Sequence, residues 1–154
     1  MPDLMAKTVA PLWQFRARVL AVMSAMLTAS MVSVFGVIWI RLSDEIKETF
    51  TLFQRLTLLF FAGIVLWGLY RMATVRVAAY EDGLAVRNVF KSYRLKWSDI
   101  SVLRLSPGDA WLQVFDQEGT RLGVLAVQTS DGPRAREAAK DLARIAKAHG
   151  AGRT

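Results

Sequence analysis

The residues with the clearest capacity for chemistry are the cations of an alternating segment, residues 84–97. Four basic side chains fall on its outward positions or in its turn: Arg87, Lys91, Arg94 and Lys96. Cations grouped in this way attract phosphate or carboxylate groups, and each contributes on the order of 1 kcal/mol near an anionic membrane surface. Polar residues also line the solvent side of any half-exposed antiparallel sheet. The pattern therefore leaves two readings open: a contact surface for anionic lipid head groups or an acidic partner, and an ordinary solvated face.

Residue types that catalyse reactions or bind metals are scarce in this chain. It has no cysteine, which excludes thiolate nucleophiles and thiolate metal sites. Its one histidine, His149, has no second titratable group beside it and fits a cation at a helix C-terminus better than a general base. The acidic residues of the second half fall in turns, not in pairs on one rigid element: Asp109, Asp116, Glu118 and Asp131. We therefore expect no enzyme, no metal and no cofactor.

Two apolar segments precede these cations, and we expect both to be transmembrane helices, although the second is uncharged only over residues 56–70 and must extend upstream to span a bilayer. Residues 19–40 carry no charge, and as a helix they extend about 33 Å, enough for a hydrocarbon core of about 30 Å. A cleaved signal peptide would have a shorter apolar region. The second span is predicted at about residues 50–71, which brings Arg55 close to the bilayer. An ionisable residue there is either functional or extends its charge to the interface.

Small residues recur along the apolar segments at spacings that let helices approach closely. They are Ala25, Ala29, Ser33 and Gly36 in the first span, and Gly63 and Gly68 in the second. The tethered second span is the expected partner of the first. Homodimerisation through the same stripe is the less favoured alternative.

The distribution of charge predicts the orientation of the two spans. The chain has 20 basic and 13 acidic residues, a formal net charge of +7. Seven basic residues flank the spans on their outer sides, and three lie in the connecting loop: Lys7, Arg16, Arg18, Arg71, Arg76, Arg87 and Lys91, against Arg41, Lys47 and Arg55. The positive-inside rule then places both termini in the cytoplasm and the loop outside.

Basic and aromatic residues are not interleaved on an open face, so nucleic acid is not expected as a partner.

The second half of the chain reads as a small β domain closed by one helix. Six short alternating segments begin at Val75, Leu84, Tyr93, Ser101, Trp111 and Arg121, with turn residues between them. Leu84, Val86 and Phe90 are expected on one face of the second strand. After residues 130–133, which supply capping groups and an early proline, an apolar stripe at helical spacing runs to Gly150. Six strands at this spacing favour a sandwich or barrel.

Three short motifs in this half resemble the bacterial pleckstrin-homology (PH) family, more narrowly the group of the low-molecular-weight protein antigen 6 PH domain. They are the segments 81–88 (EDGLAVRN), 95–100 (LKWSDI) and 126–132 (AVQTSDG). The resemblance implies a bent seven-stranded barrel plugged by the C-terminal helix, in a two-span bacterial membrane protein. The acidic turn at Glu81–Gly83 lacks the basic loop with which eukaryotic PH domains bind phosphoinositides, so that specificity is not carried over.

The sequence thus predicts a membrane α-helical hairpin followed by a PH-like all-β barrel or sandwich capped by one helix. The expected divisions are an N-terminal cytoplasmic segment 1–18, a transmembrane hairpin 19–72, a β domain 73–149 and a tail 150–154. We expect a multi-pass protein of the bacterial plasma membrane that acts as an accessory, scaffold or assembly subunit of a membrane complex. A sensor of anionic lipid at the cytoplasmic leaflet is the alternative function.

Overall fold

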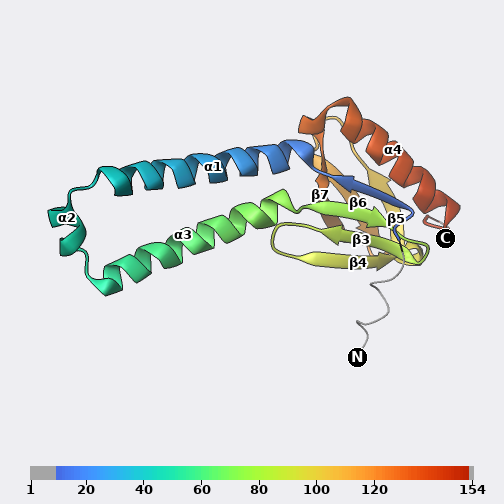
Figure 1. Ribbon diagram of the computed structural model, residues 1–154. Helices are drawn as coiled ribbons and strands as arrows, with labels where there is room; N and C mark the ends of the chain where they lie inside the picture. The colour runs from blue at the N-terminus through green and yellow to red at the C-terminus, as the bar shows by residue number, and fades with distance from the viewer. Residues whose placement is uncertain (1–9, 153–154) are drawn as a thin grey trace. The chain divides into compact units, whose positions relative to one another are not determined.

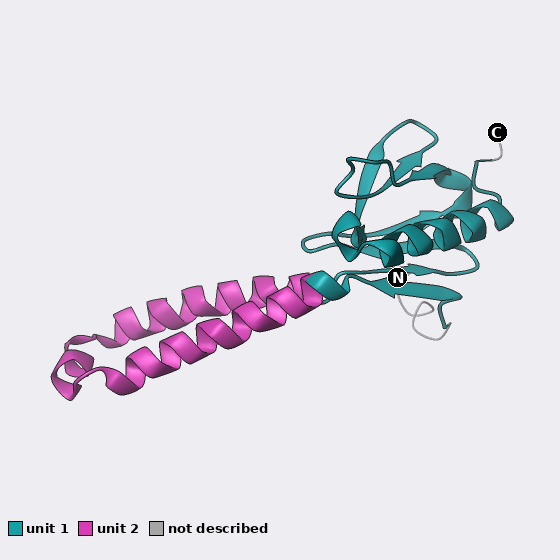
Figure 2. Cartoon of the chain, turned by 90° about the horizontal axis from the view of Figure 1, so that it is seen from above, with its two compact units in different colours: residues 1–19, 74–154 teal, residues 20–73 magenta. Residues whose placement is uncertain are grey.

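The computed structural model describes residues 10–152 and divides the chain into two compact units (Figures 1 and 2). One unit consists of residues 20–73 and is helical. The other joins residues 1–19 to residues 74–154 and contains all the strands. The helical unit is therefore an insertion in the sequence of the β unit.

The helical unit is a hairpin of two long helices that run side by side, α1 (Arg18–Arg41) and α3 (Leu52–Ala73), joined through the short helix α2 (Asp44–Thr49) (Figure 1). Their 24 and 22 residues give lengths of about 36 and 33 Å. Both are long and apolar enough to cross a membrane, and most of their side chains are exposed, with Ser24 the one buried residue of the two helices. The two apolar helices expected at 19–40 and about 50–71 are confirmed, with ends that differ by about two residues.

Polar contacts around the helix connection define where α3 begins. Thr51 and Gln54 form a capping box, in which each side-chain oxygen accepts a hydrogen bond from the backbone N–H of the other residue, at 3.3 and 3.0 Å. Arg55 lies in the first turn of α3 and donates from Nη2 to the carbonyl oxygen of Lys47. The guanidinium thus binds a carbonyl at the C-terminal end of α2, where a cation is favourable. This contact gives Arg55 a structural role in the loop.

The first sheet of the β unit has four antiparallel strands in the order β1-β2-β3-β4. They are β1 (Trp13–Arg16), β2 (Arg76–Ala79), β3 (Gly83–Arg87) and β4 (Ser92–Lys96). β1 precedes α1 and β2 follows α3, yet the two strands pair directly with each other. The sequence interpretation assigned six strands, and β1 is the seventh.

The second sheet and the last helix complete the unit. The sheet order is β5-β6-β7, from β5 (Ile100–Arg104), β6 (Trp111–Asp116) and β7 (Arg121–Gln128), and α4 (Pro133–Ala148) follows. The core takes residues from both sheets and from the apolar stripe of α4: Val77, Leu84, Val86, Leu112, Val124, Ala138 and Leu142 are all at most 3% exposed. This arrangement confirms the predicted antiparallel β domain with its closing helix.

Two polar side chains connect parts of the β unit that are distant in sequence. The side-chain amide of Asn88, just after β3, donates to the carbonyl of Gly123 and accepts from the N–H of Leu125, and so it joins the first sheet to β7. The indole N–H of Trp97 donates to the carbonyl of Tyr80. Both residues belong to the motifs that suggested the family resemblance, and both have structural roles.

Two local expectations were wrong. Phe90 was expected to share a face with Leu84 and Val86, but β3 ends at Arg87, and Phe90 is 78% exposed in the turn to β4. Asp131 was expected to help cap the helix that follows it, but α4 starts from Gly132 and Pro133 without a side-chain cap. Instead, Asp131 accepts a hydrogen bond from the N–H of Val19 in the first turn of α1, at 3.2 Å.

Candidate functional site

The outer face of the first sheet carries the candidate site. Side chains alternate along each strand, and Val77, Ala79, Leu84 and Val86 point into the core. The neighbouring positions on β2 and β3 therefore face outward. The outward positions form rows of residues that are paired across neighbouring strands. Two rows cross all four strands, Arg16, Arg76, Arg87 and Ser92, and Gln14, Ala78, Ala85 and Arg94. A third row, Gly83 and Lys96, joins only β3 and β4.

We call the row formed by Arg16, Arg76 and Arg87 the arginine row. Arg16 pairs with Arg76 across β1 and β2, and Arg76 pairs with Arg87 across β2 and β3. Adjacent strands are about 4.8 Å apart, so the three Cα atoms span roughly 10 Å. Arg16 and Arg76 are exposed and Arg87 is half-buried. Within residues 10–152, none of the three forms an ion pair with a carboxylate.

The sequence-predicted cations fall on or beside this surface. Arg87, Arg94 and Lys96 share the outer face, whereas Lys91 lies in the turn from β3 to β4. The guanidinium of Arg94 lies over the ring of Tyr80, 5.7 Å from its centroid. No acidic residue occupies an outward strand position of this sheet. The face as a whole is therefore basic.

Arg16 and Arg76 were not predicted from the sequence as site residues. Both were counted only as basic residues flanking the spans. Their meeting depends on β1, a strand of four residues separated from β2 by the helical unit. The alternation of residues 13–16, WQFR, is the one sequence signal for this strand, with Trp13 and Phe15 half-buried and Gln14 and Arg16 exposed. Four residues are too few to distinguish a strand from a loop by pattern.

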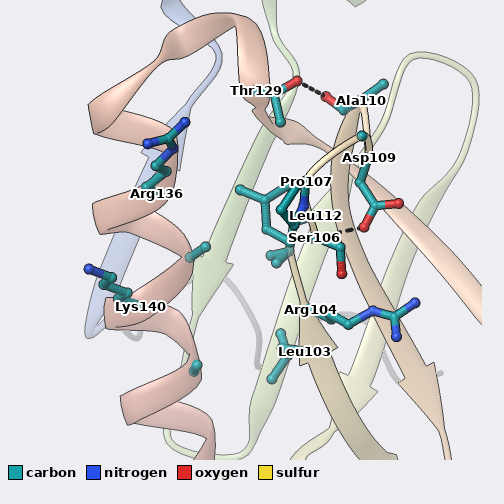
Figure 3. Close-up of a pocket in the computed structure, with 14 residues that line it drawn as sticks. Leu103, Arg104, Ser106, Pro107, Asp109, Ala110, Leu112, Thr129, Arg136 and Lys140 are labelled. Atoms are coloured by element: carbon teal, nitrogen blue, oxygen red, sulfur yellow. Dashed lines mark hydrogen bonds between the residues drawn. The ribbon is translucent and has the colours of Figure 1, made fainter.

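A groove between α4 and the β5–β6 hairpin is a second candidate, which sequence reasoning did not reveal (Figure 3). Its volume is about 880 Å³. Leu103, Pro107 and Leu112 project into it from the hairpin, and Ala139 and Ala143 line it from the helix. The groove is therefore apolar inside, with alanines as the apolar residues of its helix wall.

Cations stand at the rim of this groove. Arg136 and Lys140 extend from α4, and Arg104 extends from β5 away from the groove, with its guanidinium 5.5 Å from the ring centroid of Phe115. Asp109 is the acidic residue of the lining, and its carboxylate accepts the backbone N–H of Ser106 across its own turn. The rim therefore carries an excess of positive charge around an apolar floor.

The small residues predicted to pack the helices have room around them. A Cβ atom added at Gly36, Gly63 or Gly68 would meet no atom within 4 Å. These glycines therefore do not mark points of close helix approach within the described chain. The packing role of the stripe that includes Ala25, Ala29 and Ser33 stays a prediction, as does homodimerisation.

Comparison with known proteins supports the fold. Residues 74–146 match a family model described as Bacterial PH domain. No curated protein and no solved structure matches the chain. Among residues 10–152, no group of three or more His, Cys, Asp or Glu side chains is placed to hold a metal ion. The matched range covers β2 through most of α4, and this part of the chain belongs to the bacterial PH domain family. Strand β1 lies outside the matched range.

Proposed function

We propose that this bacterial PH domain is a non-enzymatic interaction module held at the inner membrane by the helical hairpin. It acts as an accessory, scaffold or assembly subunit of a membrane complex, with both termini in the cytoplasm. The observation that carries the proposal is the insertion of the hairpin between β1 and β2. Because these strands pair directly, two chain connections tether the domain to the hairpin.

The connections are short on both sides of the hairpin. Only Ala17 separates β1 from α1, and only Thr74 and Val75 separate α3 from β2. Asp131 also accepts the backbone N–H of Val19, the last residue of the β unit before the hairpin. A domain tethered in this way stays near the membrane, which suits a module that meets partners in the bilayer.

The groove beside α4 is the surface that we assign to a protein partner. Its apolar floor can bury apolar side chains, and the rim cations Arg136 and Lys140 favour acidic residues around them. The volume of about 880 Å³ is comparable to that of pockets that bind compact ligands or a few side chains.

Filling the groove tests this assignment. Ala143→Trp places a large ring where the helix wall now has a methyl group, and Lys147→Trp on an exposed position of the same helix is the matched control. Each full-length variant is purified in mild detergent, and co-purifying membrane proteins are identified by mass spectrometry. We expect a stable partner with wild type and the control, and its loss with Ala143→Trp. Equal recovery of the partner with both variants would remove the groove from the proposal.

Binding of anionic lipid is a second candidate function, favoured by the basic outer face of the first sheet. Five cations occupy outward positions of this sheet: Arg16, Arg76, Arg87, Arg94 and Lys96. Cations near an anionic leaflet contribute about 1 kcal/mol each and weaken with salt. Salt-sensitive binding to anionic vesicles that is lost on charge reversal at Arg87, Arg94 and Lys96 is the expected result.

A further inference from the structure

We infer that the arginine row is a binding site for lipid phosphate, formed at the end of the sheet that joins the helical hairpin. This inference rests on the proposed membrane anchoring and adds the site and the chemical class of its ligand. It goes beyond the predicted hairpin cations, because two of its three residues, Arg16 and Arg76, come from the strands on either side of the inserted helices. The site therefore does not exist unless β1 pairs with β2.

Chain geometry places the arginine row at head-group depth if the helices span the bilayer. Arg16 is two residues before the start of α1, and Arg76 is three residues after the end of α3. Extended chain covers at most about 3.6 Å per residue, so the two Cα atoms lie within roughly 7 and 11 Å of the helix ends. Helices of about 36 and 33 Å slightly exceed the hydrocarbon thickness, so their ends already enter the head-group layer.

The electrostatics of the row favour an anion. Like charges directly opposite each other in a sheet are destabilising, and here two such pairs share Arg76. Within residues 10–152, no carboxylate neutralises them by an ion pair. Guanidinium groups bind phosphate oxygens through two parallel hydrogen bonds. A phosphate bound across the row would relieve the repulsion, and Ser92 at its end offers a hydroxyl donor.

The turn from β3 to β4 supplies an independent indication of a membrane surface. β3 ends at Arg87, so this turn projects from the same end of the sheet as the arginine row. At its tip Phe90 is 78% exposed and is followed by Lys91, which is also exposed. An exposed aromatic ring beside a cation suits the membrane interface, where the ring enters the acyl boundary and the cation meets the phosphates. The turn from β6 to β7 lies near the opposite end, because Gln117 bonds Ser98 and Asp99 beyond β4.

Lipid titration of the full chain tests the site directly. Protein in neutral detergent is titrated with short-chain phosphatidylglycerol, short-chain phosphatidylcholine or inorganic phosphate. The test variant replaces Arg16, Arg76 and Arg87 by Gln, and the matched control replaces Arg121, Arg144 and Lys147 by Gln. All six side chains are at least partly exposed, so both variants should fold, which thermal unfolding checks.

The expected result is preferential binding of phosphatidylglycerol that weakens about a hundredfold in the test variant, since each cation contributes about a fivefold factor. The control should lose far less. Equal binding of both lipids, or an equal loss in the control, would overturn the site. Binding of inorganic phosphate as tight as that of phosphatidylglycerol would assign the row to a soluble anion and also overturn the lipid assignment.

The position of the turn is tested with a single label, because the chain contains no cysteine. Phe90→Cys carrying an environment-sensitive dye should shift to the blue in anionic vesicles, whereas the same dye at Glu118→Cys should not. Matching spectra at the two positions would contradict the inference. Carbonate extraction of membranes measures anchoring separately from lipid binding. Extraction of the wild-type protein would contradict the proposed function. A wild-type protein that stays in the membrane but shows no lipid preference would contradict only the assignment of the arginine row as a lipid site.

Discussion

The two units of this protein contain similarly apolar side chains, which are exposed in the helical hairpin and buried in the β unit. In the helical hairpin Leu27 and Leu59 are 54% and 68% exposed, whereas in the β unit Leu84 and Leu142 are fully buried. Contiguous exposed apolar surface of this kind is unusual in soluble proteins and marks contact with a membrane or a partner. The β unit carries its own core, whereas the hairpin requires an apolar environment supplied from outside. The difference shows that one chain combines two helices long and apolar enough to cross a membrane with a β unit that has its own buried core.

The sharpest way to break the β unit alone is a charge in its core. Leu142→Asp buries an unpaired carboxylate where α4 closes the domain. The cost of several kcal/mol approaches the total stability of about 5–15 kcal/mol expected for a small domain. We expect thermal unfolding of the full chain in detergent to lose the β-domain transition, while helix content from the hairpin remains.

The control for that variant is Arg144→Asp, on the exposed side of the same helix. It should retain the transition. A melting curve of Leu142→Asp that matches wild type would mean that α4 does not close the core.

The complementary change affects the hairpin alone. Val32→Asp introduces a charge near the middle of α1, at a residue that is 57% exposed. An aspartate at the centre of a transmembrane helix costs roughly 2.5–3.5 kcal/mol of insertion free energy. We expect a lower fraction of protein in the carbonate-resistant membrane pellet, whereas Ile46→Asp in α2 should insert normally. Unchanged insertion of Val32→Asp would argue against a spanning α1.

A smaller effect is expected at Asp131, within the β unit. Asp131 accepts the N–H of Val19, and its other carboxylate oxygen has no hydrogen-bond partner among the described residues. Loss of a helix cap costs about 1 kcal/mol. Asp131→Ala should therefore lower the stability of the β unit by about this amount in thermal unfolding. Asp131→Asn, which keeps an acceptor oxygen, should lose less, and an equal loss in both variants would show that this cap does not stabilise the β unit.

The fold was largely predictable because its elements have strong local signals. A charge-free run long enough to cross a bilayer indicated α1, and a shorter apolar run extended upstream past Arg55 indicated α3. Short alternating segments separated by turn residues indicated β2 to β7. The error at Phe90 arose because alternation was extended through a turn. Nothing local distinguishes Phe90 as a core residue from an exposed one until the end of β3 is known.

The candidate site was only partly predictable because it depends on pairing between distant strands. Arg87, Arg94 and Lys96 were found because they alternate within one hairpin. Arg16 and Arg76 join Arg87 only through the pairing of β1 with β2, across an insertion of two helices. The groove likewise forms between two elements, α4 and the β5–β6 hairpin, and its lining cannot be predicted from either segment alone.

The central claim, a PH domain held at the cytoplasmic face by an inserted hairpin, is tested most directly by finding on which side of the membrane the helix connection and the β unit lie. The chain contains no cysteine, so single cysteines at Ser43, before α2, and at Ser130, between β7 and α4, can be labelled without background. Intact cells are treated with a membrane-impermeant thiol reagent, and permeabilised cells serve as the control. The account predicts labelling at 43 in intact cells and labelling at 130 only after permeabilisation. Labelling at 130 but not at 43 in intact cells would contradict it.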